Sequence, residues 1–155
     1  MVLSKLKFPL SIQGFLVFTM LWLPAQIVSA ETVVIVNPQI QIDNISSKSL
    51  GRIYAMQVKH WADGQPIKVF TYSTQKETYR DFVISEIKIQ PHQLERLWNR
   101  LIFTGTGRAP VVVGNEKEML QKIRTTPGAI GYLETTESLS GVKSLEVENK
   151  MKTII

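Results

Sequence analysis

The feature that most restricts the fold of this chain is a repeated change in hydrophobic spacing, between the period of a strand and the period of a helix. Short runs rich in β-branched residues predict strands at residues 32–36, 67–72, 110–113, 129–133 and 142–147. Hydrophobic residues at helical spacing predict helices after Ser46, through Glu77, from Pro91 and after Asn115. This order predicts one three-layer α/β domain with a mostly parallel sheet and helices on both faces.

The helix expected from Pro91 has the clearest ends and the clearest apolar stripe. Proline suits the first helical position, where its missing N–H costs nothing. Gly105 and Gly107 are expected to end the helix, because glycine is costly inside one. Five hydrophobic residues fall on one face, which predicts that this face packs on the core: Leu94, Leu97, Trp98, Leu101 and Ile102.

Residues 1–30 have the pattern of a cleavable secretory signal peptide. Lys5 and Lys7 precede an uncharged stretch whose apolar centre, residues 15–23, is about half of the roughly 20 residues that span a bilayer. Small residues around Ala30 predict cleavage after it. The alternative, an uncleaved membrane anchor, does not suit so short a centre. We therefore expect a periplasmic protein of a Gram-negative bacterium, with its domain at residues 31–155 and no membrane anchor after cleavage.

Composition excludes several classes of protein. The sequence has no cysteine, so neither disulfides nor a lipidated cysteine are expected. Cleavage after Ala30 would remove two lysines and no acids, which lowers the formal net charge from +5 to +3. No run of basic residues and no stacking platform suggests nucleic-acid binding. A mild positive balance favours small anions only weakly.

Catalytic and metal-binding signatures are missing as well. There is no cysteine nucleophile and no Gly-x-Ser-x-Gly elbow, and the acids are scattered. The two histidines, His60 and His92, lie far apart, whereas a metal site needs three or four clustered ligands. We expect neither an enzyme nor a metal or cofactor site.

One candidate binding segment follows the strand predicted at residues 67–72. Open α/β sheets bind ligands where strands feed helix starts, and unpaired N–H groups there favour an anion. Ser73, Thr74 and Thr78 could add hydroxyl donors, and Lys76 and Arg80 could add charge. The alternative is ordinary helix capping.

A second candidate is the glycine-rich loop from Thr104 through Gly105 and Thr106 to Arg108. It lacks the lysine of a phosphate loop, and a helix rather than a strand precedes it. The alternative is a simple connection. Trp61 and Trp98 are expected to be core aromatics rather than ligand stackers.

Five segments in order resemble the phosphate-binding proteins of phosphate ABC transporters, which are type 2 periplasmic binding proteins. Residues 34–38 (Val-Ile-Val-Asn-Pro) resemble the family's strand ending in Asn-Pro, and residues 50–54 and 61–64 resemble its helix and Trp-x-Asp segment. Residues 104–107 resemble its Thr-Gly-x-Gly loop, and residues 127–133 (Pro-Gly-Ala-Ile-Gly-Tyr-Leu) are the most specific match. The resemblance covers about residues 33–134 and implies one lobe of that fold.

The departures from the family bear on function. Its members close two lobes on an oxyanion, and this chain has room for one. The family presents an Arg and then Ser-Gly-Thr at the start of a helix. When Phe82 is matched with the Phe of that helix, Thr78 falls on the family's Thr. Lys76 and Glu77 replace the Ser-Gly, Tyr72 falls near the Arg, and Glu77 would repel a phosphate.

Two functions remain open from the sequence. The first is an exported solute-binding-like domain with weak affinity for an oxyanion such as phosphate. The second is a periplasmic protein-interaction or accessory module that has lost ligand binding. An ABC transporter permease, another periplasmic protein or a second copy of the chain are the partners that these functions imply.

Overall fold

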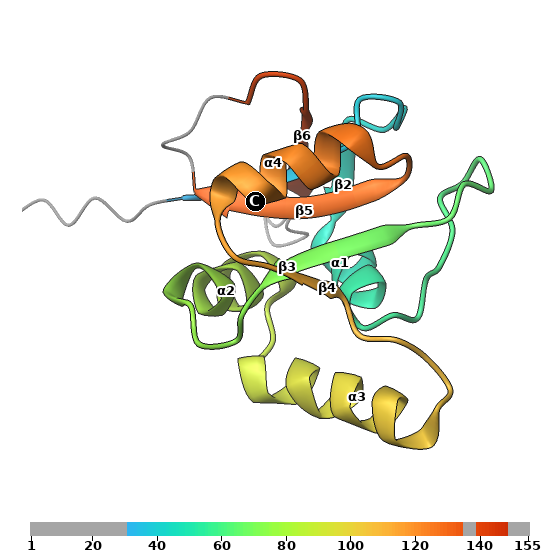
Figure 1. The fold of residues 1–155 in the computed structure, drawn as a ribbon, viewed down its shortest axis with the longest axis vertical. Helices are drawn as coiled ribbons and strands as arrows, with labels where there is room; N and C mark the ends of the chain where they lie inside the picture. Colours follow the sequence, from blue (N-terminus) through green and yellow to red (C-terminus); the bar gives the residue numbers. More distant parts are fainter. Residues whose placement is uncertain (1–30, 135–138, 149–155) are drawn as a thin grey trace, which may run out of the picture.

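The computed structural model describes residues 31–134 and 139–148 (Figure 1). The predicted signal peptide and cleavage site, and the end of the chain from residue 149, lie outside these residues. Within the described part of the chain, no helix is long and apolar enough to cross a membrane.

A six-stranded mixed sheet forms the centre of the domain. Its strands lie in the order β2-β6-β1-β5-β3-β4. They span β1 (Thr32–Val36), β2 (Asn44–Ser46), β3 (Lys68–Tyr72), β4 (Val111–Val113), β5 (Ala129–Glu134) and β6 (Lys143–Glu148). Pairs β2–β6, β5–β3 and β3–β4 are parallel, which confirms the mostly parallel sheet.

Strand β1 is the exception, because it runs antiparallel to both of its neighbours, β5 and β6. A parallel pair needs a crossover connection, usually a helix, between its two strands. No such unit joins β1 directly to β5 or β6, so the alternation of elements does not specify its direction. The short strand β2 was also not predicted, because three residues carry too little pattern.

Helices cover both faces of the sheet, as predicted. The helices on the sheet are α1 (Ser47–Tyr54), α2 (Glu77–Phe82), which continues into a π-helical turn at Val83–Ile87, and α4 (Glu116–Thr125). A further helix, α3 (Pro91–Thr104), lies outside these layers. On one face a Cβ added at Gly131 of β5 would lie 2.5 Å from the sulfur of Met119 in α4. On the other face the ring of Tyr132 stacks on Phe82 of α2 with ring centroids 3.7 Å apart.

Local side chains fix the helix ends. Ser46 Oγ accepts from the N–H of Ser49 at 3.1 Å, which confirms Ser46 as the N-cap of α1. Asn115 Oδ1 accepts from the N–H of Glu118 at 2.9 Å and caps α4. Gly105 ends α3 with a φ of +64°, a conformation that glycine adopts at little cost.

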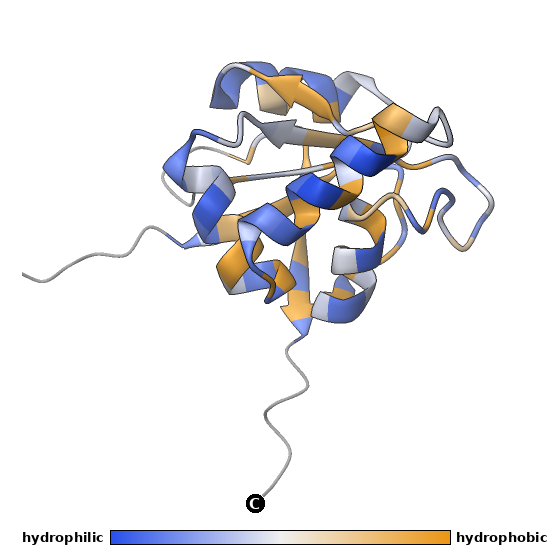
Figure 2. Cartoon of the chain, turned by 90° about the horizontal axis from the view of Figure 1, so that it is seen from below, coloured by the Kyte–Doolittle hydropathy of each residue, from blue (hydrophilic) through white to orange (hydrophobic). Residues whose placement is uncertain are grey.

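The apolar stripe of α3 is only half buried, so the expectation that all of it packs on the core is wrong. Leu94 and Trp98 are buried, and the indole N–H of Trp98 donates to the carbonyl of Tyr54 at 2.7 Å. Leu97 and Ile102 are 38% and 56% exposed. Figure 1 shows α3 below β4, apart from α2 and α4, and in Figure 2, seen from below, it is the helix nearest the viewer. One edge of its stripe is therefore covered and the other is not. Trp61 and Trp98 are core residues, as expected.

Two leucines one turn apart on α3 test this arrangement. Leu94→Ala should lower the free energy of unfolding by about 2–5 kcal/mol, because it opens a cavity under a fully buried side chain. Leu97→Ala should cost about 1 kcal/mol or less, because that side chain is already partly in water. Urea denaturation measures both variants, and equal losses would contradict the position of the helix.

Candidate functional site

The carboxyl ends of β3, β4 and β5 meet at one edge of the sheet. Tyr72 ends β3 and pairs with Val113 at the end of β4, while Glu134 ends β5, on the other side of β3. The turn at residues 73–76 leads from β3 into α2, and residues 114–115 lead from β4 into α4. We call this the carboxyl edge; it is where open α/β sheets bind ligands.

Thr78, the residue that the resemblance carries over, is hydrogen-bonded to a carboxylate. Its hydroxyl donates to Oε1 of Glu134 at 2.6 Å. The carboxylate oxygen accepts this hydrogen bond and places negative charge beside the Thr78 hydroxyl. The structure therefore brings Thr78 to the expected edge with its donor already used.

Lys76 is likewise engaged within the protein. Its ammonium donates to the carbonyl of Gly114 at 2.8 Å and lies 4.6 Å from the centre of the Tyr72 ring. These contacts tie the turn after β3 to the turn after β4. Lys76 also occupies the N-cap of α2, without a side-chain cap for that helix.

Two tyrosine hydroxyls lie beneath the edge, and they differ in their partners. Tyr132 OH accepts from the N–H of Tyr72 at 3.3 Å and is 2.9 Å from the hydroxyl of Thr71. Tyr72 OH is buried and has no hydrogen-bond partner among the described residues. The Tyr72 and Tyr132 rings meet edge to face at 5.4 Å. The edge therefore contains one buried donor that the described residues do not use.

Burial keeps these hydroxyls protonated. Desolvation raises the pKa of Tyr132 to about 12, although its hydrogen bonds with Thr71 and the Tyr72 backbone act in the opposite direction. Desolvation is also the main cause that raises the pKa of Tyr72, and the nearby charge of Glu116 adds to it. Tyr72 OH is thus a neutral donor across the physiological pH range.

The other residues predicted beside Thr78 form a turn at the surface. Ser73 Oγ accepts from the N–H of Gln75 at 3.4 Å, which is turn formation rather than a cap on α2. Thr74 and Arg80 are exposed, and neither side chain has a partner among the described residues. These residues lie at the carboxyl edge, and their role in binding remains a prediction.

The glycine-rich loop lies elsewhere. Thr104 Oγ1 donates to the carbonyl of Arg100 at 2.8 Å and is 2.7 Å from the hydroxyl of Thr106. This loop ends α3 and leads to the amino end of β4, whereas Thr78 lies beyond the carboxyl end of β3. The structure therefore does not bring Thr104, Gly105 and Thr106 into one site with Ser73, Thr74, Thr78 and Arg80.

Sequence reasoning missed Glu134 and Tyr132 as parts of this edge. Glu134 could have been found, because it is the first charged residue after the apolar run of β5 and so marks its carboxyl end. Glu116 and Glu118 begin α4 at the same edge, and Glu118 accepts from the N–H of Gly114 at 2.7 Å. These carboxylates lie at the same edge as Lys76, and the described residues contain no cluster able to hold a metal ion.

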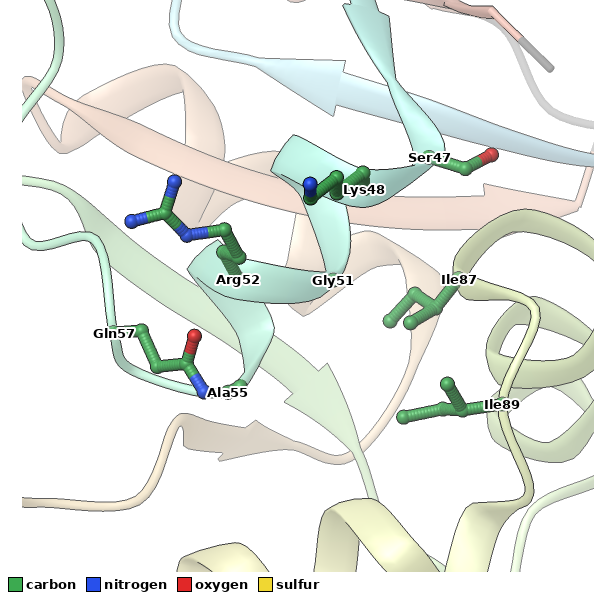
Figure 3. A pocket seen from close by; sticks show the side chains of 8 residues that line it. All are labelled: Ser47, Lys48, Gly51, Arg52, Ala55, Gln57, Ile87 and Ile89. Carbon is green, nitrogen blue, oxygen red and sulfur yellow. The ribbon is translucent and has the colours of Figure 1, made fainter. Parts of the chain in front are cut away.

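A separate open depression of about 340 Å³ lies beside α1 (Figure 3). Lys48 and Arg52 of α1 line one side, and Ile87 and Ile89 line the other. None of the predicted binding residues lines it. It is therefore distinct from the carboxyl edge.

Comparison with known proteins shows likeness in structure only. No family model and no curated protein matches the sequence. A phosphate transport receptor of ABC type from Vibrio cholerae matches with a TM-score of 0.60 and 18% identity, over 76% of this chain and 46% of the receptor. PstS from Borrelia burgdorferi matches with a TM-score of 0.58 and 20% identity, over 76% of this chain and 47% of PstS.

A third match is a phosphate ABC transporter substrate-binding protein from Clostridium perfringens, whose structure holds bound phosphate. The TM-score is 0.60 at 13% identity, over 76% of this chain and 45% of that protein. In fold, the chain resembles one lobe of a phosphate-binding protein. It spans about half the length of these proteins, and at this identity the likeness concerns the lobe's fold and not its ligand.

The two tyrosines at the carboxyl edge give a matched pair of variants. Tyr132→Phe should lower the free energy of unfolding by about 1–3 kcal/mol, because it leaves buried partners on β3 without their hydrogen bonds. Tyr72→Phe should be close to neutral or stabilising, because it removes a hydroxyl without a described partner. Chemical denaturation measures both; a large loss for Tyr72→Phe would show that its hydroxyl is hydrogen-bonded.

Proposed function

We propose that the protein is an exported, periplasmic solute-binding-like lobe whose affinity for oxyanions is weak because Glu134 occupies the anion position. It acts by binding rather than by catalysis. The observation that carries the proposal is the 2.6 Å hydrogen bond between Thr78 and Glu134 at the carboxyl edge. By the resemblance, Thr78 matches the threonine with which the family binds phosphate. Here its hydroxyl is bonded to a carboxylate, whose negative charge repels phosphate.

The retained groups support binding at this edge, and the acids account for its weakness. Thr78 and the unused hydroxyl of Tyr72 are donors, and Lys76 is a cation beside them. An incoming anion must compete with Glu134 for Thr78 and with the carbonyl of Gly114 for Lys76. Like charges a few ångströms apart at a protein surface repel by about 1–4 kcal/mol, which is enough to turn tight capture into weak binding.

Glu134→Gln tests this proposal directly. The amide keeps the shape and the hydrogen bond to Thr78 but removes the charge, so phosphate affinity should rise about tenfold, or ~1.4 kcal/mol. Calorimetric titration with inorganic phosphate measures the change. Glu146→Gln, at an exposed position of β6, is the control of equal charge and should leave phosphate affinity unchanged.

Adding Thr78→Val to Glu134→Gln should abolish the gain, because it removes the hydroxyl donor. Absence of binding heat at millimolar phosphate in both the natural protein and Glu134→Gln would overturn the proposal. An equal gain in Glu146→Gln would show that overall charge, not this site, governs the affinity.

A second candidate function is a protein-interaction or accessory module. Exposed hydrophobic residues favour it: Phe103 and Ile102 on the last turn of α3 are 91% and 56% exposed, and Val111 and Val112 of β4 are 53% and 60% exposed. A second copy, a transporter permease or another periplasmic protein are the candidate partners. Sedimentation of the natural protein and of Phe103→Asp distinguishes the two functions. Self-association that Phe103→Asp removes would favour the module.

A further inference from the structure

A pocket of about 370 Å³ opens at the amino ends of β3 and β4. The segment that leads into β3 forms one part of its lining, and the last turn of α3 with the glycine-rich loop forms another. In Figure 1 these segments lie on the right, whereas α2 and the carboxyl edge lie on the left. The pocket is therefore at the opposite edge of the sheet from Thr78 and Glu134.

The lining combines an apolar interior with a cationic rim. Its hydrophobic residues come from both sides of the pocket: Met56, Val58, Pro66, Ile67, Val69 and Leu101. Its charged and titratable residues are all basic: Lys59, His60, Lys68 and Arg108. Among the residues that the structure describes, no acidic side chain lines the pocket. The carboxyl edge differs, because Glu134, Glu116 and Glu118 contribute carboxylates there.

The cations of this rim are not used within the described part of the chain. The side chains of Lys59, Lys68 and Arg108 make no hydrogen bond or ion pair there. Other basic side chains do have partners, since Lys143 pairs with Asp43 at 2.7 Å and Lys76 donates to a backbone carbonyl. Three unpaired cations around one apolar pocket make a positive field that a bound anion would neutralise.

We propose that this pocket binds a small organic anion that carries a carboxylate on an apolar chain. Its volume lies in the range of small-molecule sites, which are mostly apolar with a few polar groups that fix orientation. Arg108 can hold a carboxylate through two parallel hydrogen bonds, and Lys68 adds a second charge. The apolar chain of the ligand packs against Leu101, Ile67 and Val69, and this contact removes the chain from water. Inorganic phosphate alone would leave that surface unfilled.

The proposal gives the glycine-rich loop a structural purpose. A Cβ added at Gly107 would lie 3.2 Å from Leu101 Cδ2, so the loop folds back closely on the helix that it leaves. That close return places Thr106 and Arg108 on the same lining as Leu101. The loop thus lines the pocket at the amino ends of β3 and β4, which explains why it does not lie with the candidate residues around Thr78.

Octanoate is the probe, and acetate and octanol are the controls. We expect saturable octanoate binding to the purified protein, with amide chemical shifts changing at residues 56–60, 66–69 and 106–108. Acetate keeps the charge without the chain, and octanol keeps the chain without the charge. Both should bind at least about tenfold more weakly than octanoate, because each loses one of the two contributions.

Variants locate the charge requirement. Arg108→Gln and Lys68→Gln should each weaken octanoate binding by about tenfold, whereas Lys117→Gln, an exposed lysine on α4, should leave it unchanged. No octanoate binding, equal binding of octanol, or equal losses in all three variants would overturn the proposal. So would displacement of octanoate by millimolar inorganic phosphate. Phosphate binding at Thr78 is read from a different set of amide signals, so either site can fail without the other.

Discussion

Strand β5 is enclosed on both faces, and the rest of the lobe is arranged around it. Ala129, Ile130, Tyr132 and Leu133 are fully buried there. Gly131 lets α4 approach closely on one face, while the Tyr132 ring stacks on Phe82 on the other. The Tyr132 hydroxyl then reaches β3 and bonds to its last two residues. One strand therefore sets the spacing of both helical layers and fixes the end of the strand that leads into α2.

The glycines of this region show why its sequence is so restricted. Gly128 has a φ of +76°, and a Cβ there would lie 2.1 Å from the carbonyl oxygen of Pro66. The same glycine's carbonyl accepts from the indole of Trp61 at 3.0 Å. Residues 127–133 were the most specific part of the resemblance found from sequence. A side chain at Gly128 or Gly131 would not fit without displacing a neighbour, so the fold itself restricts these two positions.

The sequence was sufficient for the helices and for every strand except the short β2, since these depend on local spacing and capping. Ser46, Asn115 and Gly105 act at the helix ends as their types predict. Sequence did not predict the direction of β1, which depends on strands far along the chain. It also did not predict the bond from Thr78 to Glu134 or the rim of Lys68 and Arg108, because each joins residues that only the fold brings together.

The two edges of the sheet differ in how their charged groups are engaged, and this difference separates two sites. At the carboxyl edge, Lys76 donates to a backbone carbonyl and Thr78 donates to a carboxylate, so both donors are already engaged within the lobe. At the amino ends of β3 and β4, the cations around the apolar pocket have no partner in the described part of the chain. A lobe that retains a fold need not retain its site at the same edge.

The antiparallel placement of β1 has a consequence for how the chain reaches its folded state. Val34 pairs with Tyr132 and with Leu145, so the first strand of the domain is held between two of the last. Such distant pairings raise the contact order and delay folding, because long loops must close before the contacts form. During synthesis, β1 emerges well before either partner. The centre of the sheet can therefore form only after residues 129–145 have been synthesised.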